Sequence, residues 1–212
     1  MEFFYEVTTP SGEIFEVNPT VLNDYRSRIG IDHAIAGRYS NMFLADIYQH
    51  ERIFGISSDE VLEAIKEEES GENLYGAKAS TPFNRYPLKG LWHKHYISAR
   101  FIPHNIYNAM QRGNLERIVR EVYDPKISPV ATEEMGHELA NRVVTETLRD
   151  KRRKSKMTGE WIVFAKYQGK NYYLCMGTHK MKDIELRNKI DLVCVKEFPF
   201  LKGMMLPREA DG

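Results

Sequence analysis

The feature that most constrains the fold is the stretch from Glu160 to Lys180. Residues 161–167 are rich in β-branched and aromatic side chains, residues 168–171 contain turn formers, and residues 172–176 return with strand-like chemistry. This pattern predicts a β-hairpin. Strands joined by a tight turn pair antiparallel, which argues against a doubly wound parallel sheet at this position.

The strongest helical pattern follows Thr132, a capping residue with acidic residues in the first turn after it. Apolar residues at helical spacing continue the pattern and predict a helix over 132–150. We expect an α+β fold, with a small antiparallel sheet packed on helices and a mostly helical, acidic N-terminal part. The expected sheet contains strands 161–167, 171–177 and 191–195 and packs on the helix at 132–150.

Charge is unevenly distributed along a chain whose formal net charge is zero. Residues 1–75 contain 5 Lys and Arg against 15 Asp and Glu, whereas residues 76–212 contain 25 against 15. The stretch 70–90 is rich in Gly and Pro and lacks periodicity, which predicts an internal boundary. We expect an acidic part at 1–75, a basic α+β domain with the catalytic site at 88–202 and a flexible tail at 203–212. Opposite charges predict that the first part folds against the remainder.

Composition is that of an ordinary soluble protein, with 42% hydrophobic and 28% charged residues among 212. No apolar run approaches the roughly 20 residues that span a membrane, and the N-terminus lacks a signal-peptide pattern. We therefore expect a cytoplasmic protein without a membrane partner. Cys175 and Cys194 lie in apolar runs and are expected to be buried, reduced thiols. The oligomeric state is left open.

The segment His93-Lys94-His95 is the first candidate site. On a strand the two imidazoles share one face and Lys94 points to the other. The spacing suits two metal ligands, with His104 or His137 as a third, so a metal-dependent hydrolase is one alternative. His137-Glu138 begins like a zinc-protease helix, but Asn141 stands where the second histidine is needed. We expect no metal and no other cofactor.

Cleavage of RNA is the second candidate chemistry, because it needs a base, an acid and cations around the phosphate but no metal. Histidine, lysine and hydroxyl side chains supply these groups. The candidate catalytic residues are His93, His95, Thr178, His179 and Lys180. Each histidine alone is equally compatible with a surface or strand-capping role, so the hypothesis depends on their convergence.

Six of the eight residues from Arg149 to Lys156 are basic. Such a run is typical of a solvated helix end, and it also suits phosphate contacts. Exposed tyrosines can stack on nucleobases. The candidate nucleic-acid-binding residues are Lys94, Lys151, Arg152, Arg153, Lys154, Lys156, Tyr167 and Tyr172.

The histidines, Thr178, Lys180 and the sheet pattern resemble the barnase, EndoU, colicin and RelE-like group of small ribonucleases. The resemblance covers about Gly90 to Leu201. It implies a metal-independent endoribonuclease, toxin-like or phage-associated, that acts on RNA; an acidic partner or inhibitor protein is a second candidate partner. A non-enzymatic nucleic-acid-binding module and a protein-interaction domain whose acidic part contacts a basic chain remain alternatives.

Overall fold

The computed structural model describes residues 4–72, 79–96, 102–111, 113–153, 160–178 and 181–205, without the side chains of residues 102, 104, 105, 108 and 146–153. Its contacts divide the chain into two compact units. The first unit comprises Met1–Leu74, Ala79–Ser98 and Gly159–Gly212, and the second comprises Tyr75–Lys78 and Ala99–Thr158. In sequence, the two segments of the second unit therefore lie between segments of the first.

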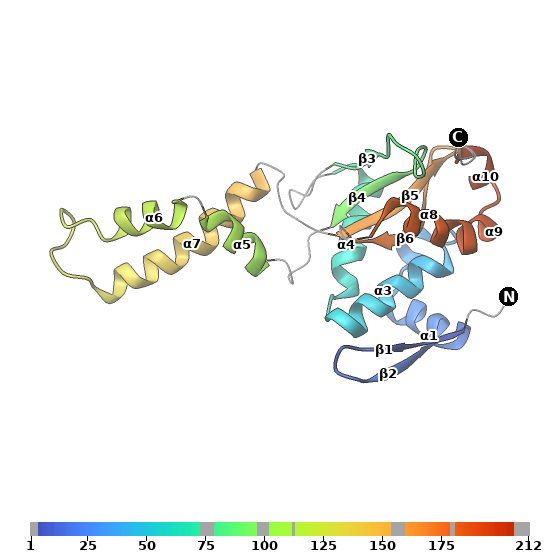
Figure 1. Cartoon of the computed structure of the whole chain (residues 1–212), viewed down its shortest axis with the longest axis horizontal. Helices are drawn as coiled ribbons and strands as arrows, with labels where there is room; N and C mark the ends of the chain where they lie inside the picture. Colours follow the sequence, from blue (N-terminus) through green and yellow to red (C-terminus); the bar gives the residue numbers. More distant parts are fainter. Residues whose placement is uncertain are drawn as a thin grey trace. The chain divides into compact units, whose positions relative to one another are not determined.

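The fold is α+β, as the sequence predicts, and Figure 1 shows the order of its elements. The first unit contains β1 (Tyr5–Thr8), β2 (Ile14–Val17), α1 (Pro19–Ile29), α2 (Asp32–Ile35), α3 (Asn41–Phe54), α4 (Ser58–Ser70), β3 (Thr81–Pro82), β4 (Trp92–Tyr96), β5 (Glu160–Tyr167), β6 (Lys170–Gly177), α8 (Asp183–Lys189), η2 (Ile190–Cys194), α9 (Val195–Glu197) and α10 (Leu201–Met204). The second unit contains α5 (Ile102–Met110), α6 (Asn114–Val122) and α7 (Glu133–Arg153). No described helix is long and apolar enough to cross a membrane.

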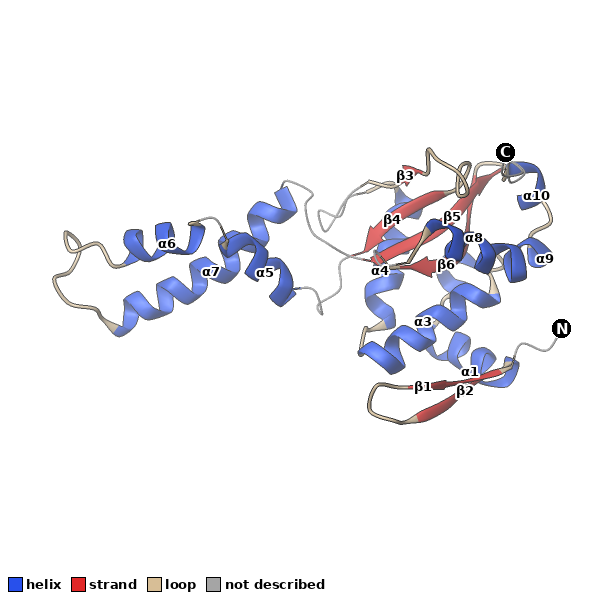
Figure 2. Ribbon diagram, viewed as in Figure 1, coloured by secondary structure: helices blue, strands red, loops and turns tan. Residues whose placement is uncertain are grey.

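The predicted hairpin is confirmed as β5 and β6, joined by a turn at Gln168 and Gly169 with φ of 49° and 74°. Two consecutive positive φ angles match the twist of the flanking strands and therefore suit a two-residue hairpin turn. The sheet is antiparallel throughout, in the order β3-β4-β5-β6 (Figure 2). The strand at Trp92 therefore pairs directly with the first strand of the hairpin.

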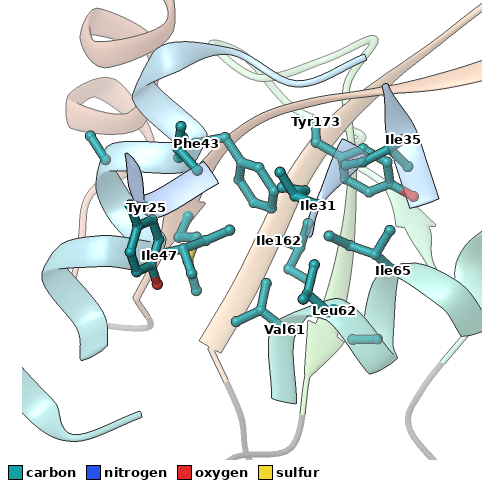
Figure 3. Close-up of a cluster of buried hydrophobic side chains, with 14 of the residues drawn as sticks. Tyr25, Ile31, Ile35, Phe43, Ile47, Val61, Leu62, Ile65, Ile162 and Tyr173 are labelled. Carbon is teal, nitrogen blue, oxygen red and sulfur yellow. The ribbon is translucent and has the colours of Figure 1, made fainter. Parts of the chain in front are cut away.

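The two faces of this sheet bury separate cores. On one face Ile162 and Tyr173 pack against α3 and α4, where Phe43 stacks on Tyr173 with ring centroids 5.7 Å apart (Figure 3). On the other face Val163 packs in a cluster with Leu186 of α8 and other residues that follow the hairpin. Because side chains alternate along a strand, every β4 residue is assigned to one of these two layers.

The predicted strand at 191–195 is wrong, because this segment continues α8 as the π-helical turn η2. Its short apolar run fits a strand or a buried helical turn equally well. In the helical conformation, Ile190 and Cys194 are buried on one side. Arg187 also forms an ion pair with Asp191, one turn later, at 2.9 Å. The sheet takes its further strands from β4 and β3 instead.

The predicted helix at 132–150 is present as α7, but the sheet packs on other helices. Helices α3 and α4 contact the sheet on one face and α8 contacts β6, whereas α7 packs on α5 and α6 within the second unit. The amphipathic pattern identified the helix correctly. Periodicity does not specify which partner covers the apolar face.

The units also differ from the predicted division into 1–75, 88–202 and 203–212. The first 74 residues share one unit and one core with the sheet. The open edge of β6 is bound by this segment, since Ser40 N donates to Tyr173 O at 2.9 Å and Tyr173 N donates to Arg38 O at 2.8 Å. The tail expected from 203 onward still contains α10 residues and the buried Met205.

Both cysteines are free and buried, as predicted. Burial raises the pKa of the Cys175 thiol well above its ordinary value and raises that of Cys194 to about 12. Neither is a thiolate near neutral pH, so neither has the chemistry of a nucleophile in this fold.

Candidate functional site

The candidate site is built around the two histidines of β4. His93 and His95 lie on the same face of the strand, with ring centroids 5.5 Å apart and planes at 73°. The prediction that alternation brings the two imidazoles side by side is confirmed. Both rings are half-buried, so they combine a fixed strand backbone with access to solvent.

Two aromatic side chains surround this pair. Phe83 lies 4.5 Å from His93, and Trp161 of β5 lies 5.3 Å from His93 and 6.2 Å from His95, all between ring centroids. Phe83 and Trp161 also contact each other at 6.0 Å. We call these four residues the histidine cluster. Packing against Phe83 and Trp161 restricts the rotation of the His93 ring, and packing against Trp161 and His93 restricts that of the His95 ring.

Thr81 of the edge strand β3 is a polar neighbour that the sequence did not identify. Its Oγ1 lies 3.2 Å from Nε2 of His93, and the two residues are direct cross-strand partners. The only sequence signal is a hydroxyl residue placed before Pro82, twelve positions ahead of His93, in a stretch expected to contain an internal boundary. The short pairing of β3 with β4 brings these two residues into contact although they are twelve positions apart.

Lys94 points to the opposite face and is only 5% exposed. Its Nζ lies 3.5 Å from Glu67 and 3.9 Å from Glu68, both on α4. Lys166 of β5 also contacts Glu68, at 3.5 Å. In this structure the ammonium of Lys94 neutralises core carboxylates, so it is not placed to contact a phosphate at the surface. Side chains alternate along β4, so the residue between the two histidines points to the other face of the sheet.

Thr178 follows β6 at the same end of the sheet as His95. His95 pairs with Trp161, and Trp161 pairs with Gly177, the residue before Thr178. Two inter-strand spacings, about 10 Å, therefore separate the backbone of His95 from that of Gly177. Thr178 is half-buried, and its carbonyl accepts a hydrogen bond from Met181 N at 3.0 Å. His179 and Lys180 lie outside the described residues.

The two tyrosines assigned to nucleobase stacking already contact aromatic rings within the protein. Tyr167 lies parallel to Phe200, with ring centroids 4.1 Å apart, and Tyr172 packs on Phe198 at 5.3 Å. They sit at the turn of the hairpin, six residues along β5 from Trp161, or about 20 Å. The structure does not bring them together with the histidines.

The basic run belongs to the second unit, whereas the histidine cluster belongs to the first. Lys151, Arg152 and Arg153 end α7 in the second unit, and their side chains are not described. Lys154 and Lys156 lie outside the described residues. Their contact with phosphate stays a prediction from sequence.

Metal ligation was the competing use of the histidines. Within the described parts of the chain, no three His, Cys, Asp or Glu residues are arranged to hold a metal ion. His137 lies on α7, exposed and 3.6 Å from Glu133, and the side chain of His104 is not described. The described site contains a fixed pair of imidazoles, which are groups suited to acid–base chemistry.

No family model, curated protein or solved structure matches this chain in the comparisons with known proteins. The geometry of the histidine cluster is therefore the basis on which a function is inferred.

Proposed function

We propose that this chain is a metal-independent endoribonuclease in which His93 and His95 are the acid and the base. One observation carries the proposal: two half-exposed imidazoles lie 5.5 Å apart on the same face of a strand, inside an aromatic frame. A pair of this kind can take one proton and give another on either side of a bound phosphodiester.

The reaction needs only groups of this kind. One imidazole removes the proton from a ribose 2′-hydroxyl, and the 2′-oxygen attacks the adjacent phosphorus. The bond to the 5′-oxygen breaks, and the other imidazole protonates that oxygen. The products are a 2′,3′-cyclic phosphate and a 5′-hydroxyl. Cations must offset the charge on the phosphorane, and we assign this role to Lys180, with Thr178 and His179 as further candidate residues.

The non-enzymatic alternatives have less support. A single-strand-binding module would use Tyr167 and Tyr172 for stacking, but these rings are engaged with Phe198 and Phe200. An interaction domain would offer its acidic residues to a basic partner, but Glu67 and Glu68 already face Lys94 inside the molecule. Neither alternative explains the paired histidines.

The test is incubation of the purified chain with RNA and with DNA of the same sequence, each with and without EDTA. We expect cleavage of RNA alone, unaffected by EDTA, since DNA lacks the 2′-hydroxyl nucleophile. The rate should follow a bell-shaped pH profile around the ordinary histidine pKa of about 6.5.

A chain carrying both His93→Ala and His95→Ala, purified in parallel, reports any contaminating nuclease. Intact RNA under all conditions would contradict the proposal. Cleavage that EDTA abolishes would instead favour the metal-dependent alternative.

A further inference from the structure

We infer that the loop between β3 and β4 holds single-stranded RNA beside the histidine cluster, with Arg85 on a phosphate and Tyr86 stacked on a nucleobase. The inference rests on the proposed function and deepens it, because it names the form of the substrate and two residues that bind it. The loop comprises residues 83–91 and joins the two strands directly (Figure 2). We call it the β3–β4 loop.

The β3–β4 loop begins at the histidine cluster. Its first residue, Phe83, packs on His93 with ring centroids 4.5 Å apart. Phe83 N also donates to Leu91 O at 2.9 Å, which closes the loop at its base. Arg85 and Tyr86 follow Phe83 by two and three positions, so at most about 7 Å and 11 Å of backbone separate them from it. A strand held by these two residues therefore runs close to the imidazoles.

The β3–β4 loop is anchored in the core, so its exposed side chains start from a fixed backbone. Leu88 and Leu91 are fully buried in the core that also contains Leu186 of α8, and Leu91 N donates to Leu88 O at 3.0 Å. Arg187 of α8 donates a hydrogen bond to Pro87 O at 2.8 Å. A site on such a support loses little conformational freedom when it binds a ligand.

The loop carries positive charge that no neighbouring acid neutralises. Residues 82–91 include Arg85 and Lys89 but no Asp or Glu. Both side chains are exposed, and neither forms an ion pair or a hydrogen bond within the described parts of the chain. The other described arginines of the first unit each pair with a carboxylate: Arg26, Arg28, Arg38, Arg52 and Arg187. Arg85 is therefore available to a phosphate, which a guanidinium binds through two parallel hydrogen bonds.

Tyr86 differs in the same way from the tyrosines at the hairpin turn. It is 39% exposed, and its ring contacts no other aromatic ring in the part of the chain that the structure describes. Tyr167 and Tyr172, by contrast, pack on Phe200 and Phe198. An uncovered ring can stack on a nucleobase of any sequence. We therefore transfer the stacking role from the hairpin tyrosines to Tyr86.

These two contacts favour a single strand over a duplex. Each base inside a duplex is covered on both faces by its neighbours, so Tyr86 can stack only on a base in a single strand, a loop or a strand end. Arg85 can contact a phosphate in either form. Holding one base and one phosphate also fixes the ribose and the phosphodiester on which the histidines act.

The test measures how the full chain binds a short fluorescent 2′-O-methyl RNA, a probe that lacks the 2′-hydroxyl nucleophile and so stays intact. Tyr86→Ala should weaken binding of the single strand by about 5–150-fold, the usual effect of losing a base–aromatic stack, and Tyr86→Phe should leave it unchanged. Arg85→Gln should also weaken binding and lower the slope of log affinity against log salt by about 0.7, the contribution of one phosphate contact. Lys170→Gln, beside the hairpin turn and exposed, is the matched control and should change neither quantity.

A duplex of the same sequence separates the two contacts. Arg85→Gln should weaken binding of the duplex as well, whereas Tyr86→Ala should weaken binding of the single strand alone. Equal losses for both forms in Tyr86→Ala would overturn the stacking role and the preference for a single strand. An unchanged affinity for the single strand in either folded variant would overturn the role of that residue, and a wild-type chain that binds neither form would overturn the whole inference.

Binding and cleavage are measured separately, so this inference and the proposed function can fail separately. Cleavage of ordinary RNA by a chain in which both variants bind like the wild type would refute the role of the β3–β4 loop and retain the nuclease. Binding that depends on Arg85 and Tyr86 in a chain that cleaves no RNA would retain the loop as a single-strand site and refute the nuclease proposal. If both hold, Tyr86→Ala should raise KM for RNA with little change in kcat.

Discussion

Replacing His95 with alanine is expected to lower the rate of RNA cleavage by about 10²–10⁴-fold, the usual contribution of a general acid or base. His93 is not expected to compensate for the loss of His95. The ring of His93 is held by Thr81 and Phe83, so it cannot turn to take over the second proton transfer. A half-buried ring can be removed from the strand face without opening the core.

The measurement is the single-turnover rate on a short RNA, with circular dichroism to show that the variant is folded. His137→Ala is the matched control, because this histidine is exposed on α7 and lies outside the cluster. We expect the control to cleave at the wild-type rate. A folded His95→Ala chain that keeps more than about a tenth of the activity would remove His95 from the mechanism. Even a weak general acid or base accelerates a reaction by more than about tenfold.

Replacing Asp46 with alanine is expected to lower the free energy of unfolding by about 3–5 kcal/mol, as for other broken buried ion pairs. Asp46 is 4% exposed on α3; its carboxylate binds Lys189 of α8 and accepts a hydrogen bond from Met176 N on β6 at 2.7 Å. Burial lowers the pKa of Lys189, Asp46 is the main influence that raises it, and the net shift is upward. Removing the carboxylate leaves a charge and a buried amide without their partner.

Denaturant unfolding measures this effect, with Asp24→Ala as the control at an exposed carboxylate of α1. The control should change the free energy of unfolding by less than about 0.5 kcal/mol. Asp46 joins the acidic first part of the chain to both the sheet and a helix that follows it. A loss below about 1 kcal/mol for Asp46→Ala would show that this carboxylate does not hold these parts together, because a surface ion pair contributes no more than that.

The sequence predicts local features best, because the residues that form such a feature lie close together in the chain. The hairpin from Glu160 to Gly177 combines strand propensity with a turn, and both were sufficient to identify it. The shared face of His93 and His95 follows from alternation on any strand. These features need no knowledge of distant segments.

The remaining features depend on contacts between segments far apart in the chain. The pairing of β4 with β5 spans the larger segment of the second unit. The burial of Lys94 depends on carboxylates from α4, and the contact of Thr81 with His93 depends on a two-residue strand that no periodicity reveals. Apolar character alone likewise did not distinguish a strand from a helical turn at 191–195.

Attack by a 2′-hydroxyl, assisted by two imidazoles, is tested most directly with a short RNA that contains a single 2′-deoxynucleotide at the mapped cleavage site. In EDTA, the all-ribose substrate should yield a 2′,3′-cyclic phosphate and a 5′-hydroxyl, and the deoxy substrate should stay intact at that linkage. Cleavage at the deoxy linkage, or a product with a 5′-phosphate, would refute this mechanism.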